Sequence, residues 1–527
     1  MTRSNVHSLI YFVLLAAMVV AIPTSNFLMS AAQIFLALNW IVEGQWQSKM
    51  QRARKQPLLW AFVVLFAVHL IWILLSSNCS YAIDDIRKKL PFLIVPLIVL
   101  TSSPLSCKRF NILMWVYVTT MFAVSLYSWI NHIVNPDISY RSLFPFISHI
   151  RLALNACLVI FLLLYVVNKL LNNRKLLLFK RKVYICMILL LIGWFVGYLF
   201  LLQSYTGFII LLITVVVVCY IYIKRHFSTR RVAIFFLAVA ATIFSIVGVV
   251  VYYAYDYYSL KPLSVDSLKT HTANGNAYVH SKDGFVEHGN YSNNYICHIE
   301  IEQEWRRISS KPLDYITPNG YSIEPTLIRY LNSKGLTKDS VGLSVLTEND
   351  IIAIEQGKAS YYDAYGNVVE KMMYRLLFEY ENYRVYHRVK NSSLLQRFEL
   401  WKNTSELIAQ NPIFGVGTGD VADAIHKNLQ YNNSELKDTE MRTHNQYLTF
   451  ILAFGFFGTL IITAFFGYAI IKQRLWKSLL MVAYLCIVAI SFMSEDTLET
   501  AAGCLFCTFF FCVFTTQKQC FSNLAET

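Results

Sequence analysis

The chain has 527 residues, a length that would suggest several domains in a soluble protein. Apolar residues make up 56% of the sequence and charged residues only 15%, which is too apolar for a water-exposed surface of this size. This composition excludes a soluble globular enzyme, a disordered chain and a disulfide-rich secreted domain. It predicts a polytopic membrane protein, because runs such as 209–219 and 232–253 cross or nearly cross a bilayer.

Twelve apolar segments are predicted to span the membrane. They cover residues 8–23, 27–42, 58–76, 90–103, 111–131, 150–168, 183–202, 207–223, 232–255, 447–471, 478–494 and 500–515. With a cytoplasmic N-terminus, the segments that lie inside carry 21 Lys and Arg residues, whereas the short outer loops carry 4. This excess is the positive-inside pattern, so the net charge of +14 is an orientation signal and gives nucleic-acid binding no support.

The span at 90–103 is the weakest, because it is short and contains Pro91 and Pro96. Without it, the six basic residues of 169–182 would lie outside, so we keep it as an extended or tilted span. The N-terminal apolar run has no small-residue cleavage site and is predicted to be a retained first span.

The predicted fold class is therefore an all-α polytopic membrane protein with about 12 transmembrane helices and one large, mixed extracytoplasmic domain between spans 9 and 10. Residues 1–255 hold spans 1–9, and residues 256–446 form the outer domain. Residues 447–527 hold spans 10–12 and a short cytoplasmic tail. The outer domain is slightly acidic, with 20 Lys and Arg against 24 Asp and Glu.

Inside the outer domain, residues 326–333 and 350–357 have helical spacing and end near Gly335 and Gly357, as helices often do. Residues 361–388 are rich in Tyr and Phe. Such aromatic faces suit sugar rings, a membrane interface or the packing of a small domain equally well.

Residues 394–410 are predicted to form a helix, which Ser392 can cap and Pro412 ends. Arg397 and Trp401 are four positions apart and share one face of this helix. An arginine beside an aromatic residue is usually solvated or stacked at a surface, and a ligand-binding role is the alternative.

Gly415, Gly417 and Gly419 form a GxGxG motif after this helix. No strand precedes the motif and no Lys-Ser/Thr pair follows it, so a nucleotide phosphate loop is not supported. Two interpretations remain: a bend that brings backbone N–H groups near an anion, and a plain turn.

His444 and Asn445 come directly before the tenth span, at the predicted outer boundary of the membrane. An imidazole at this place could accept a proton near neutral pH. A single histidine at an interface is more often structural, so the position alone does not decide its role.

Taken together, these features resemble the O-antigen ligase and polymerase superfamily of bacterial envelope glycosyltransferases. The matching order is a multi-span protein, a large late outer loop, Arg397 and Trp401 on one helix, the turn at 411–419, and His444-Asn445 leading into a span. The similarity covers about residues 390–470. It does not separate ligases, which join a glycan to lipid A core, from polymerases or protein-glycosylating relatives.

The resemblance implies a GT-C-like, metal-independent membrane glycosyltransferase that needs no cofactor. Its donor is expected to be a glycan on undecaprenyl pyrophosphate, its acceptor a lipid A core sugar, and its location the bacterial inner membrane with a large periplasmic loop. Carried over by position, His444 is the catalytic base, and Arg397 and Arg151 bind the donor pyrophosphate. The supporting positions are Trp401, Gly415, Gly417, Gly419 and Asn445.

One position departs from the family pattern. Many relatives carry an arginine at the outer end of the span that begins near Tyr205, and this chain does not. Another cation, a different mode of donor binding, or a different alignment would each account for this.

Two further features of the outer segments compete with this interpretation or extend it. The adjacent carboxylates Asp84-Asp85 could hold a divalent cation, as in metal-dependent oligosaccharyltransferases, although the basic run 87–89 could neutralise them. Cys79 and Cys297 fall clearly outside the spans, and a disulfide between them is one possibility.

Two functions of other classes remain: a transporter or flippase for an envelope lipid, and a structural or sensory protein that only binds glycan. Transporters commonly have repeated halves and broken spans with polar residues at mid-membrane. Here the spans divide nine plus three around one large domain and charge within the spans is rare, which favours the transferase.

Overall fold

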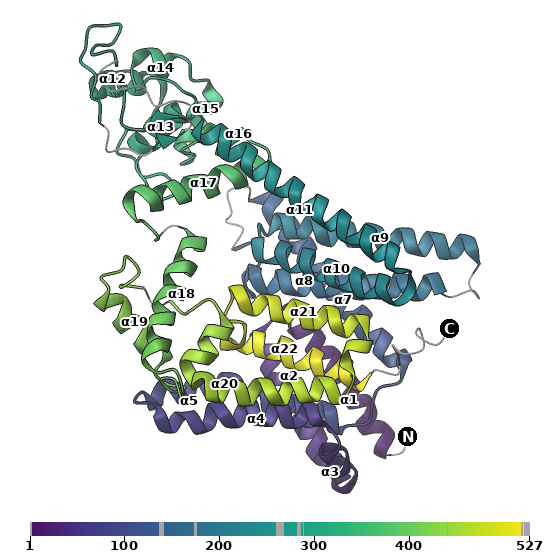
Figure 1. Ribbon diagram of the computed structural model, residues 1–527. Coiled ribbons are helices and arrows are strands. Elements are labelled where there is room, and N and C mark those ends of the chain that lie inside the picture. The colour runs from purple at the N-terminus through teal and green to yellow at the C-terminus, as the bar shows by residue number, and fades with distance from the viewer. Residues whose placement is uncertain are drawn as a thin grey trace. The chain divides into compact units, whose positions relative to one another are not determined.

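A computed structural model describes residues 3–135, 142–172, 177–259, 268–281, 286–287, 289–390, 392–439, 441–517 and 520. The chain packs as two compact units. The first combines Met1–Ala233 with Arg397–Thr527, and the second is Ile234–Gln396. Both units are built almost entirely from helices (Figure 1).

The first unit contains the long apolar helices. In chain order its elements are α1 (Arg3–Ala21), α2 (Asn26–Glu43), α3 (Trp46–Arg54), α4 (Pro57–Ile71), the 3-10 helix η1 (Trp72–Leu75), α5 (Cys79–Lys89), α6 (Pro91–Thr101), α7 (Cys107–Val134), α8 (His149–Asn172), α9 (Leu178–Leu201), α10 (Tyr205–His226), the start of α11 (Thr229–Tyr258), most of α18 (Ser393–Gln410), α19 (Val421–Tyr431), α20 (Gln446–Lys472), η4 (Leu475–Lys477), α21 (Leu479–Ser494), η5 (Thr497–Glu499) and α22 (Ala501–Thr516).

The all-α polytopic class is confirmed. Each of the twelve predicted spans coincides with a helix, and within the described residues nine helices are long and apolar enough to cross a membrane. The count of twelve spans stays a prediction, because α6 has 11 residues and α21 and α22 have 16 each. A helix of 16 residues is about 24 Å long, less than the ~30 Å hydrocarbon core of a bilayer.

The short helices have identifiable causes. Between α21 and α22 the chain makes a turn at residues 495–499 that is buried in protein, where non-helical backbone is tolerated. The turn leaves each of the two flanking helices short. The other short helix, α6, continues α5 almost without a break, since Leu90 ends one helix and begins the next.

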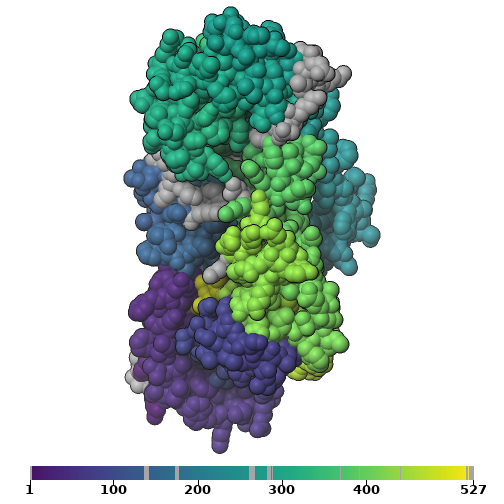
Figure 2. All heavy atoms as spheres, turned by 90° about the vertical axis from the view of Figure 1, so that its left-hand side faces the viewer, coloured from purple at the N-terminus to yellow at the C-terminus, as the bar shows by residue number. Residues whose placement is uncertain are grey.

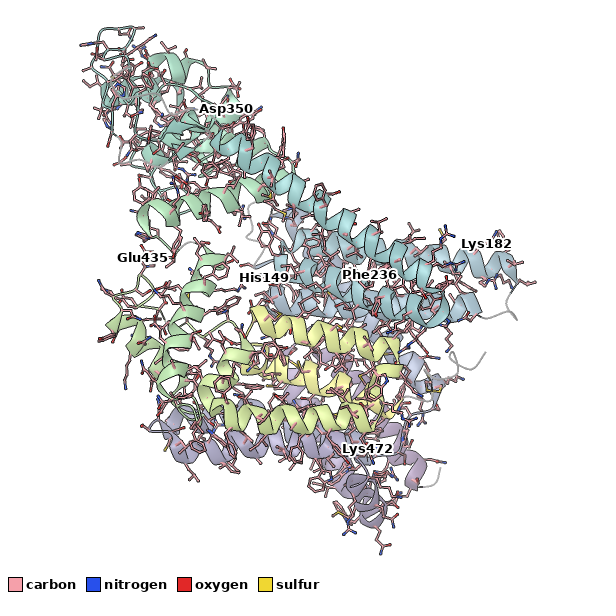
Figure 3. All side chains as sticks on the ribbon, viewed as in Figure 1. His149, Lys182, Phe236, Asp350, Glu435 and Lys472 are labelled. Carbon is pink, nitrogen blue, oxygen red and sulfur yellow. A yellow bond between two sulfur atoms is a disulfide. The ribbon has the colours of Figure 1, made fainter. Side chains whose placement is uncertain are left out.

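The last helices pack among the first ones, with α20 against α4 and α22 against α6 (Figure 1). Figure 3 shows His149 and Glu435, from segments predicted to lie outside, at one end of this helical bundle. Lys182 and Lys472, from segments predicted to lie inside, are at the other end. The predicted orientation is therefore consistent with how the helices run.

The second unit is a small helical body. Besides the rest of α11 and the first residues of α18, it holds β1 (Val286–Glu287), β2 (Asn290–Tyr291), α12 (His298–Ile308), α13 (Ile323–Ser333), α14 (Ser340–Ser344), α15 (Glu348–Glu355), α16 (Tyr361–Tyr365) and α17 (Val368–Tyr386). The two strands pair as an antiparallel hairpin. Trp305 and Tyr330 lie at the centre of its apolar core. Over the residues of this unit that the structure describes, the regular elements are helices apart from the two-residue strands, whereas we expected a mixed domain.

The helices predicted near 326–333 and 350–357 are confirmed as α13 and α15, and Gly335 and Gly357 follow them with positive φ angles of 68° and 85°. The helix predicted at 394–410 is confirmed as α18, with the Ser392 hydroxyl accepting from the Leu395 N–H. Residues 397–446 pack with the first unit, so the compact second unit is smaller than the predicted outer domain. Which residues lie outside the membrane remains a prediction.

The structure contains a disulfide, but between other cysteines than the pair considered from the sequence. Cys107 at the start of α7 is bonded to Cys520 beyond the end of α22. Cys79 and Cys297 are both free thiols, so the pairing considered from the sequence is wrong. No sequence spacing links residues 413 positions apart, so only the packing of the helices reveals this pair.

In the second unit, Glu300 predicts a pH-dependent stability. Its buried carboxylate accepts hydrogen bonds from the Thr272 hydroxyl, from Asn276 Nδ2 at 2.8 Å and from the Ser340 N–H at 3.0 Å. Burial alone would raise the pKa of Glu300, but these donors to its charged form lower it to about 2 from 4.5.

We expect Glu300→Gln to destabilise the full chain by about 1–3 kcal/mol, because an amide cannot satisfy all these donors. Since the folded pKa is depressed, the stabilisation is present above pH 4.5 and is lost as the pH falls toward about 2. Thermal unfolding in detergent at several pH values measures this, with the surface variant Glu302→Gln as the control. An equal pH dependence in both variants would contradict the assignment.

Candidate active site

Arg397 lies on α18 and reaches the end of α21. Its Nη2 donates to Glu495 Oε1 at 2.7 Å, and its Nε donates to the carbonyl of Ser494 at 3.1 Å. The side chains of this ion pair are only 19% and 11% exposed, so water screens the pair weakly. The helix predicted from sequence therefore places its arginine at a buried carboxylate.

His444 meets the same carboxylate. Its Nδ1 lies 3.8 Å from Glu495 Oε2, and its side chain is 36% exposed, so a ligand can reach the ring. Burial opposes ionisation of Glu495, but the contacts with His444 and Arg397 lower the pKa of that carboxyl below its ordinary value. Two predicted site residues, 47 positions apart in sequence, thus converge on one residue that the sequence analysis missed.

The backbone of His444 is held in an unusual conformation, with φ of +50°, a region that non-glycine residues seldom adopt. The Asp496 carboxylate accepts from the His444 N–H at 2.8 Å and the Asn445 N–H at 3.1 Å. It also accepts from the hydroxyls of Thr443 and Thr449, both at 2.7 Å. Burial raises the pKa of Asp496 in spite of these donors. Asp496 therefore fixes the backbone that presents the imidazole.

Arg151 lies in the first turn of α8 and reaches the same turn. Its Nη2 donates to the carbonyl of Asp496 at 3.4 Å. Its Nη1 is buried and has no hydrogen-bond partner among the described residues. A buried guanidinium nitrogen that lacks an acceptor is costly, so it suits a site that receives an anionic oxygen.

A second group of charges lies next to this site, around Glu499. Lys89 Nζ is 3.0 Å from Glu499 Oε2 and 2.5 Å from Asp85 Oδ2, and all three side chains are at most 8% exposed. Arg442 Nη1 is 3.4 Å from the same Glu499 oxygen, and its Nη2 donates to the Tyr81 hydroxyl at 2.9 Å. The two cations lower the pKa of Glu499 although burial opposes this.

Gln446 joins this group to the start of α20. Its Nε2 donates to Glu499 Oε1 at 3.0 Å, and its Oε1 accepts from the Leu498 N–H at 2.7 Å. A small cavity of about 20 Å³ lies beside these residues, lined by Lys89, Arg442 and the buried His69 of α4. The 495–499 turn is thus bonded on both sides, to the residues that precede α20 and to α5.

The turn that contains Gly415, Gly417 and Gly419 stabilises a break in helix α20. Helix α20 is broken at Gly455, whose φ is +62°. The N–H groups of Val416 and Gly417 donate to Leu452 and Ala453 carbonyls at 2.8 and 2.9 Å. In return, the Phe456 N–H donates to the Pro412 carbonyl at 2.8 Å and the Phe457 N–H to the Ile413 carbonyl at 3.1 Å. The 411–419 turn thus satisfies the backbone groups that the break leaves unpaired.

The contacts of each glycine explain its residue type. A Cβ on Gly415 would come within 2.4 Å of the Leu452 carbonyl oxygen, and one on Gly417 within 2.6 Å of Ser76 Oγ. A Cβ on Gly419 would come within 2.4 Å of the Asn78 carbonyl oxygen, and the Gly419 N–H donates to Ser76 at 2.8 Å. Since the Val416, Gly417 and Gly419 N–H groups are bonded to protein, the contacts favour the plain turn over an anion site.

The residues after this turn lie against the beginning of the chain, as Figure 2 shows for the light-green segment on the violet-blue helices. Asp420 accepts from the N–H groups of Ser77 and Asn78, both at 2.8 Å. The structure brings Arg397, His444 and Arg151 together at residues 494–496. Elements far apart in sequence contribute one residue each.

Two supporting residues have roles away from the carboxylates. Asn445 caps α20, with its side chain accepting from the Tyr447 and Leu448 N–H groups. Trp401 lies one turn after Arg397, and its ring meets the edge of Phe398 at 5.5 Å between centroids. Its Nε1 is buried without a hydrogen-bond partner in the described part of the chain.

Asp84 and Asp85 do not face one site. Asp84 is 59% exposed and pairs with Arg87, whereas Asp85 is 3% exposed and pairs with Lys89. Two residues of the basic run 87–89 therefore neutralise these carboxylates, as considered from the sequence. The two carboxylates are not placed to share a cation. Over the residues that the structure describes, no three His, Cys, Asp or Glu side chains are grouped to hold a metal ion.

The sequence analysis missed the acidic residues of the turn and their cations, Lys89 and Arg442. A signal was present: outside residues 256–446 the sequence has only eight Asp or Glu residues, and three of them are Glu495, Asp496 and Glu499. Acidic residues clustered between two apolar helices are costly to bury and point to function.

Comparison with known proteins adds one match. Residues 351–463 match a family model described as O-antigen ligase. The matched segment holds Arg397, the 411–419 turn and His444, whereas Glu495 and Arg151 lie outside it. No curated protein matches the chain.

The buried ion pairs around Glu499 predict a large effect of removing their cation. Lys89→Met leaves two buried carboxylates without their ammonium group and is expected to cost about 3–5 kcal/mol of stability. Arg87→Met, on the exposed side of the same helix, is expected to cost at most about 0.5 kcal/mol. Thermal unfolding of both variants in detergent tests this. Similar unfolding temperatures would mean that the buried group contributes little.

Proposed function

We propose that this chain, whose residues 351–463 match the O-antigen ligase family model, transfers a glycan from undecaprenyl pyrophosphate to an acceptor hydroxyl. The proposed acceptor is a lipid A core sugar, at the outer face of the bacterial inner membrane. The observation that carries the proposal is the convergence of Arg397 and His444 on Glu495. Pyrophosphate binding and base catalysis need these two groups close together.

Arg397 and Arg151 are the proposed ligands of the donor pyrophosphate. A guanidinium stays protonated and gives phosphate oxygens two parallel hydrogen bonds. The buried Nη1 of Arg151, which has no partner among the described residues, supports a role in receiving such an oxygen. Tyr205, the position at which the resemblance leads us to expect an arginine, begins α10.

His444 is the proposed base. The acceptor hydroxyl gives its proton to the imidazole while its oxygen forms a bond to the anomeric carbon of the donor sugar. The bond between that carbon and the pyrophosphate oxygen breaks, and the lipid pyrophosphate leaves with the electron pair beside the arginines. The partial exposure of the ring and its fixed backbone support this role.

Ligation, polymerisation of a polysaccharide and glycosylation of a protein hydroxyl differ only in the acceptor. The deciding experiment incubates the purified chain with a lipid-linked glycan and each class of acceptor, and identifies products by mass spectrometry. Product on lipid A core supports the ligase, and product on glycan or peptide alone would replace it. Absence of product with every acceptor would contradict the transferase.

We expect His444→Ala and Arg397→Ala each to lower the transfer rate by about 10²–10⁴-fold, because a base and a pyrophosphate ligand are lost. Membrane abundance should not change. The controls are His426→Ala, whose ring is bonded to Gln430 on the surface, and Arg306→Ala, a 73% exposed arginine. Normal transfer by either site variant would remove that residue from the mechanism.

The transfer is expected to persist in EDTA, because guanidinium groups supply the positive charge in this proposal. The transfer rate of the purified protein, measured with and without chelator, tests this. A loss of activity that Mg²⁺ restores would contradict the proposed metal independence.

A further inference from the structure

Glu495 stands between the proposed pyrophosphate ligand and the proposed base. One carboxylate oxygen is 2.7 Å from Arg397 Nη2, and the other is 3.8 Å from His444 Nδ1. The first distance is a strong charge-assisted hydrogen bond, and the second is too long for a hydrogen bond. The carboxylate is therefore committed to the arginine and only near the histidine.

We propose that Glu495 is a positioning residue that exchanges Arg397 for His444 when the donor pyrophosphate binds. The inference rests on the proposed function. A pyrophosphate and a carboxylate compete for the same guanidinium, since both are anions that bind its N–H groups. Two groups remain beside a carboxylate displaced from Arg397. One is the Nδ1 of His444, 3.8 Å away, and the other is the Arg151 guanidinium, which interacts with Glu495 electrostatically but is itself a proposed ligand of the incoming pyrophosphate.

The displaced carboxylate would make the base competent. A carboxylate that accepts from Nδ1–H fixes the ring and leaves Nε2 free to take a proton from the acceptor. It also stabilises the imidazolium that forms after proton transfer. The exchange would thus couple the strength of the base to the presence of the donor, so that His444 is activated only when there is a glycan to transfer.

The neighbouring carboxylate cannot take this role. Asp496 is held by four donors, from two backbone N–H groups and two threonine hydroxyls. Glu495 has no such set of neutral donors: it is paired with Arg397, lies near His444 and interacts electrostatically with Arg151. One carboxylate of the turn is locked and the adjacent one can exchange partners.

The test is Glu495→Gln in the detergent-solubilised full chain, with farnesyl pyrophosphate as a soluble probe of the donor. We expect the probe to bind about fivefold or more tightly, because its competitor is neutral. The transfer rate at saturating donor should fall about 10–100-fold, as when a histidine loses its carboxylate partner. The acid limb of the pH–rate profile should move to lower pH, because the imidazole loses a neighbouring negative charge.

A purely structural role would not tighten binding while slowing turnover. Glu406→Gln, on the same helix as Arg397 and bonded to Asn428 and Asn432, is the control and should leave all three readouts unchanged. Glu495→Ala gives the same binding test if the glutamine variant does not fold. Unchanged or weaker probe binding in both variants would overturn the exchange.

Arg397→Ala separates this inference from the proposed function. If that variant binds the probe as well as the unaltered chain does, Arg397 is not a pyrophosphate ligand and the proposed function itself fails. If it loses the probe while the Glu495 variants bind no tighter, the proposed function stands and only the exchange is wrong.

Discussion

The arrangement of the site depends on the burial of one short acidic turn. Residues 495–499 connect two apolar helices and bring three carboxylates into the protein interior. Each carboxylate has to be paired or hydrogen-bonded there, because an isolated buried charge is prohibitively costly. The chain meets this need with residues from four other segments, and these same residues form the candidate site. Glu499 is paired with Lys89 of α5, and Asp496 accepts from the N–H of His444 before α20. Glu495 is paired with Arg397 of α18.

A second constraint is the break in α20. A helix interrupted in an apolar setting leaves carbonyl and N–H groups that must find partners. The 411–419 turn supplies them, and it can approach closely enough only because glycines lie on both sides of the contact, at Gly415 and Gly455. The break was not expected, since broken spans were weighed as a mark of transporters. Here a protein turn fills the break, so its polar backbone groups are not left to bind a transported solute.

The three carboxylates of the turn also differ in what they can do. Asp496 is saturated by neutral donors and acts as a fixed anchor, with a raised pKa caused by burial. Glu499 is held by two cations and has a lowered pKa. Glu495 shares its charge between a guanidinium and a nearby imidazole, the two groups to which the proposed transfer assigns leaving-group binding and proton removal. Within one turn, Asp496 thus anchors the backbone, while the adjacent Glu495 contacts the groups proposed to carry out the transfer.

The sequence by itself determined the membrane class, the helix positions and the resemblance to the O-antigen ligase superfamily, because apolar runs and local spacing are properties of contiguous residues. It also singled out Arg397, Arg151 and His444, which carry motifs or stand at span ends. It did not determine the pairing of Cys107 with Cys520, the broken helix at Gly455 or the acidic turn with Lys89 and Arg442 as partners. These were decided by tertiary structure alone, because each joins residues separated by tens to hundreds of positions that become neighbours only when the last helices pack among the first.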